Sequence, residues 1–409
     1  MPALLDAAAK NLALRPAVAA VLGARGRWLA TRRADWQRVT DSAAPGLAAR
    51  GVPDDPAVWE TGSRGERRAY LMLLRDRDQA TALDLLAAGW SRETGDDRAD
   101  LLAVLERGLS AADEEFLEGA LEDRKASVRA AAARLLAQLP GSAFTRRAAE
   151  RAAPLLRVER HALRRRLVAS LPGAADASAH RDGITAGPRP PGIRAAAWLL
   201  TQLIAAAPLT EWVSRSGLDA GQLVSLPVEG GLGVDVHAGW RLAAICQASP
   251  EWAAALLAAG PPGPAGGRPA AAWPQDHELA AVLPPDARAA RAAALLTRAA
   301  ASPAAIAEAV NCPGPWPESL ADAAVGALCG IAAGRTAAGR TVAAATQSRW
   351  PAALVSAAAR HLPVTGRGDH AAALVRLADA ATCPPTWSSV LRRTAGTLAL
   401  RRAFLEEIR

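Results

Sequence analysis

KASVRAAAARLLAQL, residues 125–139, is the stretch from which the fold is predicted. Its apolar residues recur at i, i+3, i+4, i+7, i+8 and i+11 and therefore form one stripe of an α-helix: Val128, Ala131, Ala132, Leu135, Leu136 and Leu139. Pro140 and Gly141 follow and end this helix, and Ser142 is a suitable N-cap for the next. The pattern predicts two short amphipathic helices joined by a tight turn.

Similar helix start signals occur earlier in the sequence. Ser110 precedes Asp113 by three residues, and Thr94 precedes Asp97 by three, which is the spacing of a capping box at a helix start. Neither helix can bury its apolar stripe alone, so neighbouring helices must stack. Helix pairs return at roughly 30 residues, a period typical of helical solenoids, with starts expected near Arg64, Gly95 and Lys125.

The segment LEDRKASVRAAAARLLAQLP resembles a HEAT-type repeat, because an acidic turn at Asp123 leads into Val128-Arg129 and a small residue, Ala132. We therefore predict an all-α fold, a HEAT-like α-solenoid of stacked antiparallel helix pairs; an ordinary helical bundle remains the alternative. Glycine- and proline-rich stretches suggest linkers at 172–192 and 260–270. The segments between them are expected to be N-terminal repeats (1–171), a central helical segment (193–259) and C-terminal repeats (271–409).

Composition predicts a helical protein with neither a membrane-spanning segment nor a metal site. Of the 409 residues 51% are hydrophobic, with alanine and leucine dominant, which favours helices. The four cysteines form no C-x-x-C pair, and the six histidines are scattered, so we expect neither a metal site nor a cofactor. Cys246 and Cys329 lie in apolar runs and are expected to be buried. No signal peptide or membrane span is recognisable, which predicts a cytoplasmic protein.

The net charge of +8 comes from 48 basic and 40 acidic residues, and nearly all the base is arginine. Such an excess over this length is weak support for nucleic-acid binding. Its densest concentration follows Pro154, in a segment to Leu171 that we predict to be a basic helix. The basic residues there are Arg157, Arg160, His161, Arg164, Arg165 and Arg166.

Arginines one turn apart on a helix would offer parallel donor forks to phosphates. We therefore take Arg157, Arg160, Arg164 and Arg165 as the candidate face for a partner or for phosphate. The alternative, which the lack of interleaved aromatic residues favours, is a solvated face partly paired with Glu150 and Glu159.

Two further patterns are weaker candidates. The segment 227–239, with Gly230, Gly231 and Gly233, is predicted to be a loop that lacks the lysine and spacing of a phosphate-binding loop. The acidic run Asp113, Glu114, Glu115, Glu118 and Glu122 fits a helix first turn whose charges complement the dipole and Arg124/Lys125. We predict no catalytic residues in either and no enzymatic activity.

Four segments carry a family resemblance: ALLDAAAKNLALRPAVAAVLGARGRWLA, LSAADEEFLEGALEDRKASVRAAAARLLAQLPGSA, GWRLAAICQASPEWAAALL and LRRAFLEEIR. They resemble a bacterial family of HEAT-like helical repeat proteins without assigned catalytic residues. Genes of that family lie beside genes for MoxR-type AAA ATPases and von Willebrand A-domain proteins. The family's members extend further at the N-terminus, so a shortened start is expected here.

The resemblance implies an adaptor or scaffold in an ATPase-linked assembly, with a protein partner that includes an AAA ATPase. The stacked helix pairs support the same expectation, a non-enzymatic protein-interaction module. Nucleic-acid binding through the arginine-rich segment is the alternative.

Overall fold

The computed structural model describes residues 2–10, 15, 18, 22, 24–41, 56–161, 164–184, 189–260, 275–298, 302–332, 349–365, 368–380, 383 and 385–408. The chain divides into two compact units, one formed by residues 1–116 with 403–409 and the other by 117–402. Helices dominate both units, as predicted. Most of the predicted linker 260–270 lies outside the described residues.

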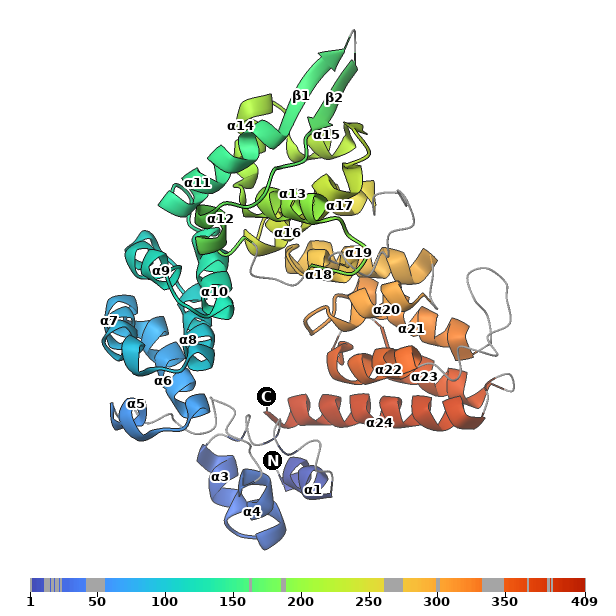
Figure 1. The fold of residues 1–409 in the computed structure, drawn as a ribbon. Coiled ribbons are helices and arrows are strands. Elements are labelled where there is room, and N and C mark those ends of the chain that lie inside the picture. The colour runs from blue at the N-terminus through green and yellow to red at the C-terminus, as the bar shows by residue number, and fades with distance from the viewer. Residues whose placement is uncertain are drawn as a thin grey trace. The chain divides into compact units, whose positions relative to one another are not determined.

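The described part of the first unit consists mainly of short helices (Figure 1). The α-helices are α1 (Pro2–Lys10), α3 (Ala24–Ala30), α4 (Ala34–Asp41), α5 (Ala57–Thr61), α6 (Arg64–Arg77), α7 (Gln79–Gly89), α8 (Gly95–Leu102) and the start of α9 (Glu114–Ala120). Three 3₁₀ turns lie between them: η2 (Trp90–Arg92), η3 (Ala103–Glu106) and η4 (Ala111–Asp113).

The predicted helix starts are confirmed. The side chain of Thr94 accepts a hydrogen bond from the backbone N–H of Asp97, and Ser110 forms a capping box with Asp113. Ser142 caps α11 by accepting from the backbone N–H of Thr145. Each cap satisfies N–H groups that lack a partner within the first turn. Short-range signals therefore decide where these helices begin.

The second unit contains two apolar cores and a small sheet. Its helices are α10 (Ala126–Leu136), α11 (Ala143–Ala152), α12 (Ala177–Arg181), α13 (Ala195–Ala206), α14 (Leu209–Ser216), α15 (Ala220–Ser225), α16 (Gly233–Cys246), α17 (Pro250–Ala259), α18 (Asp276–Ala280), α19 (Pro285–Arg298), α20 (Pro303–Val310), α21 (Glu318–Ala332), α22 (Arg349–His361), α23 (His370–Asp379) and α24 (Pro385–Ile408). The 3₁₀ turn η5 (Ala153–Leu155) follows α11. One core runs from Ala152 to Leu283, and the other from Ala289 to Leu398.

The predicted basic helix at 154–171 is wrong, although the chain is mostly helical and consistent with the predicted all-α class. The segment forms strands β1 (Leu156–His161) and β2 (Arg164–Ala169), which pair antiparallel; β3 (Val228–Glu229) joins β2 in parallel. Leu156 and Leu167 are buried in the first core, and Val158 packs against it. Alternate residues of a strand share a face, so a period of two places these apolar side chains together, and this burial outweighs the helix propensity of arginine and leucine.

Helices α13 and α16 of the first core are closely packed against each other. A Cβ atom added at Gly239 of α16 would lie 2.7 Å from Ile204 of α13 and 2.9 Å from the carbonyl oxygen of Thr201. Trp240 follows Gly239, is fully buried, and its ring centroid lies 5.2 Å from that of Trp252. Only a glycine permits this approach of α13 and α16, which fixes the position of Trp240 behind the hairpin.

Candidate arginine hairpin site

The two faces of the hairpin differ in what they contact. Register pairs Leu156 with Ala169, Val158 with Leu167 and Arg160 with Arg165, so that these six side chains share one face. We call this the inner face, because its apolar members pack into the core. On the outer face Arg157 lies opposite Val168 and Glu159 opposite Arg166, and Arg164 of β2 lies on the same face. The predicted arginines are therefore divided between the faces of a ribbon.

A cavity of about 350 Å³ lies beside the inner face. Leu156, Val158 and Leu167 form its apolar lining on the hairpin side, and Leu223 of α15 adds to it. The polar lining comes from the strands, from α14 and from α16: Arg157, Arg160, Arg165, Trp212, Arg215, Ser216 and Trp240. In Figure 1 the two strands extend beyond α14 and α15, the helices whose residues line the cavity. No carboxylate is among these lining residues.

The arginines of the hairpin are unequally paired. Arg157 Nε donates to Glu159 at 2.7 Å, and Arg166 contacts both Glu159 and Glu229. The pairing with Arg157 lowers the pKa of the Glu159 carboxyl, in spite of partial desolvation. In contrast, Arg160 and Arg165 are exposed, and no carboxylate in the described part of the chain pairs with them. The predicted pairing with Glu159 therefore holds for Arg157 and Arg166 only.

Two buried donors accompany these arginines. Trp212 is 4% exposed and Trp240 is fully buried, yet the indole Nε1 of each has no hydrogen-bond partner. A buried tryptophan normally finds an acceptor for its N–H, because leaving the group unpaired costs about 1–3 kcal/mol. Sequence reasoning overlooked Trp212, Arg215 and Trp240, since nothing in their local pattern links them to residues 156–167.

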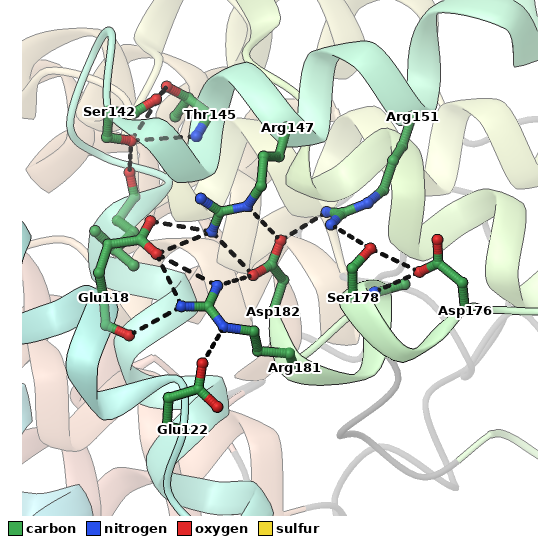
Figure 2. Close-up of polar contacts among 12 residues, drawn as sticks. Glu118, Glu122, Ser142, Thr145, Arg147, Arg151, Asp176, Ser178, Arg181 and Asp182 are labelled. Carbon is green, nitrogen blue, oxygen red and sulfur yellow. Dashed lines mark hydrogen bonds and ion pairs between the residues drawn. The ribbon is translucent and has the colours of Figure 1, made fainter.

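A separate cluster of charges holds α9, α11 and α12 together (Figure 2). The Asp182 carboxylate, which is fully buried, contacts Arg147 at 2.9 Å, Arg151 at 2.7 Å and Arg181 at 3.0 Å. Arg147 also contacts Glu118 at 3.0 Å. Burial opposes ionisation of Asp182, but the bonds from Arg147 and Arg151 overcome it and hold its pKa below the usual value. This cluster lies partly within the predicted linker 172–192, which contains α12.

The acidic run has partners other than the predicted Arg124 and Lys125. Glu118 and Glu122 contact Arg181, and the side chain of Asp113 is completely buried against Arg75 at 2.6 Å. The guanidinium of Arg75 also donates hydrogen bonds to the backbone carbonyls of Gln79, Arg107 and Gly108. These carboxylates are thus neutralised within the fold.

The glycine-rich segment is shorter than predicted. β3 precedes it, Gly230 and Gly231 adopt positive φ, and α16 begins at Gly233. The turn connects a strand to a helix without a lysine.

Cysteine burial differs from the expectation. Cys246 and Cys329 are only partly buried, whereas Cys312 is buried, and desolvation raises the pKa of its thiol to about 11. Within the described residues no three His, Cys, Asp or Glu side chains gather as metal ligands. The helices of that same part of the chain lack the combination of length and apolar character that crossing a membrane requires.

Comparison with known proteins leads to a family but to no function. The profile of DUF5691, a family of unknown function, matches residues 1–408. The chain belongs to this family. No curated protein and no solved structure matches it. For this member of DUF5691 the function therefore has to be argued from the hairpin and the cavity themselves.

Proposed function

We propose that this protein is a non-catalytic scaffold whose arginine hairpin binds an acidic, extended segment of a partner protein. The observation that carries the proposal is that β1 is an edge strand: the sheet order is β1-β2-β3, and no other described strand pairs with the outer side of β1. An unpaired edge can accept a further strand through main-chain hydrogen bonds.

The backbone pattern supports the same proposal. The N–H of Ser170 donates to the carbonyl of Leu155. Since hydrogen-bonded pairs alternate along an antiparallel ladder, the N–H and C=O groups of Leu156, Val158 and Arg160 point away from β2. The exposed guanidinium of Arg157 lies on the edge strand β1, and that of Arg164 lies on the same face of the neighbouring strand β2; both would favour carboxylates on the added segment.

The frame that presents the hairpin is, in this proposal, a HEAT-like solenoid of stacked helix pairs in the cytoplasm. The resemblance to HEAT-like proteins makes a MoxR-type AAA ATPase the first partner to test. Repeat scaffolds of this kind bind partners through surfaces that many short helices assemble.

Nucleic acid is the second candidate, because the exposed arginines of the hairpin could also contact phosphates. Against it, residues 156–169 contain no phenylalanine, tyrosine or tryptophan for stacking on bases. Binding to nucleic acid would weaken steeply as salt is raised.

The test is affinity purification from the native organism, with and without nuclease, of the wild type and the variant Arg157→Glu/Arg164→Glu. We expect a partner with an acidic segment that survives nuclease and is lost from this variant. The matched control, Arg376→Glu/Arg393→Glu, reverses two exposed arginines on α23 and α24 and should retain it. Loss of every partner on nuclease treatment would instead favour nucleic acid, and equal capture by both variants would refute a role for the hairpin.

A further inference from the structure

The inner face of the hairpin carries an unfavourable arrangement of charge. Arg160 and Arg165 lie directly opposite each other in the β1–β2 register. Like charges at such positions destabilise an antiparallel pair, because their Cβ atoms are close. The adjacent positions on the same face hold Val158 and Leu167, which pack favourably against the core. The two arginines are thus a local departure from a stable pattern, at the rim of the cavity.

A third guanidinium reaches the same cavity from another element. Arg215 of α14 lines it and is exposed, and it pairs with the partly exposed carboxylate of Glu211 at 3.5 Å. An exposed pair at this distance neutralises little charge. Arg157, the fourth arginine of the lining, is paired with Glu159 at 2.7 Å. Three less neutralised guanidinium groups, on β1, β2 and α14, therefore line one space whose lining contains no acid.

The inner wall of the cavity adds neutral donors. Trp212 and Trp240 both line it, and the indole N–H of each is buried without an acceptor in the described structure. An unpaired buried donor is costly, and two beside one cavity are unusual in a natural fold. A ligand with negative charge and further oxygen acceptors would satisfy both the arginines and the indoles.

We propose that this cavity binds a small organic anion that carries a phosphate group. A tetrahedral phosphate presents oxygens in several directions and matches guanidinium groups from three elements, whereas a planar carboxylate suits one or two forks. The volume of about 350 Å³ is at the lower end of ligand pockets. It accommodates a phosphorylated small molecule and excludes a folded partner. This site does not depend on the acidic partner segment proposed for the edge of β1.

Calorimetric titration of the full chain with β-glycerophosphate, at constant ionic strength, tests the proposal. We expect saturable binding, weakened about a hundredfold in Arg160→Ala/Arg165→Ala, since each lost charge-assisted hydrogen bond costs about tenfold. Arg164→Ala is the matched control, because Arg164 is the next residue along β2 but lies on the outer face. No binding by the wild type, or equal binding by the double variant, overturns the proposal.

A second variant keeps the test independent of hairpin folding. Trp212→Phe preserves a six-membered aromatic ring but removes the pyrrole part of the indole with its N–H, so it should weaken the ester's binding while the protein stays folded. Trp316→Phe is its control, because the indole N–H of Trp316 donates to Cys312 in the other core. Unchanged affinity in Trp212→Phe would show that the Trp212 indole does not contribute to binding. Tighter binding of citrate than of the ester would assign the cavity to polycarboxylates and overturn the phosphate assignment.

Discussion

The Asp182 cluster and the arginine hairpin are both rich in arginine, but only the cluster pairs its arginines with a buried carboxylate. In the cluster, each of Arg147, Arg151 and Arg181 contacts one buried carboxylate. In the hairpin, Arg160 and Arg165 face each other with no carboxylate within pairing distance in the described part of the chain. The cluster joins three helices, and the hairpin borders a cavity.

The difference teaches that arginine density alone does not distinguish structure from binding. What distinguishes them is whether the fold itself supplies the opposing charge. A fold gains from a buried carboxylate that is fully hydrogen-bonded, whereas unopposed like charges cost it stability. Unopposed charge beside a cavity with unpaired donors is therefore where a ligand or partner is to be sought.

The largest effect should come from breaking the cluster. Asp182→Ala leaves three arginines around a space with no carboxylate, and we expect the free energy of unfolding to fall by about 3 kcal/mol, as for other buried ion pairs. Urea unfolding measures it. The control Asp379→Ala removes an exposed partner of Arg392 and should cost less than about 1 kcal/mol. Equal losses in the two variants would show that the cluster is no more than a surface network.

Lowering the pH should reduce the stabilisation by the Asp182 cluster gradually, whereas Asp182→Ala removes it at once. The pKa of Asp182 is lower in the folded protein than in the unfolded chain. Its stabilisation is therefore complete above the ordinary aspartate pKa of about 4 and is lost as pH falls through the lowered folded value. Urea unfolding at stepped pH should show a steeper loss in the wild type than in Asp182→Asn. Parallel curves would contradict this assignment.

The smallest effect concerns the hairpin without ligand. Arg165→Glu replaces a like-charged cross-strand pair with an opposite one, so the free energy of unfolding should rise by about 0.2–1 kcal/mol. The same change should weaken phosphate-ester binding. Arg164→Glu on the outer face provides the control for added negative charge. A fall in stability in Arg165→Glu would mean that Arg160 and Arg165 are not in repulsion.

Local rules predicted much of the helical part. The stripe of residues 125–139 is confirmed in α10, where Val128, Ala132, Leu135 and Leu136 are buried, and the cap at Ser142 is also confirmed. Both depend on contacts within a few residues, which the sequence contains explicitly. The solenoid arrangement and the scaffold role stay proposals.

The hairpin could not be predicted in the same way. Arginine and leucine favour helix in isolation, and the alternation of Leu156 and Val158 becomes decisive only once a core is present to bury them. The candidate arginines were therefore placed on the wrong kind of element, and their role as a binding face stays a proposal. The outer arginine Arg164 and the inner arginine Arg165 were not separable without the register.

By itself, the sequence determined a mostly helical chain, its helix starts and the concentration of arginine at 157–166. Only the tertiary structure decided that Arg160 and Arg165 share a face, and that Arg215, Trp212 and Trp240 meet them at one cavity. The physical reason is range. Helix periodicity and capping act over a few residues, whereas strand register and burial against α14 and α16 join residues that are far apart in the chain.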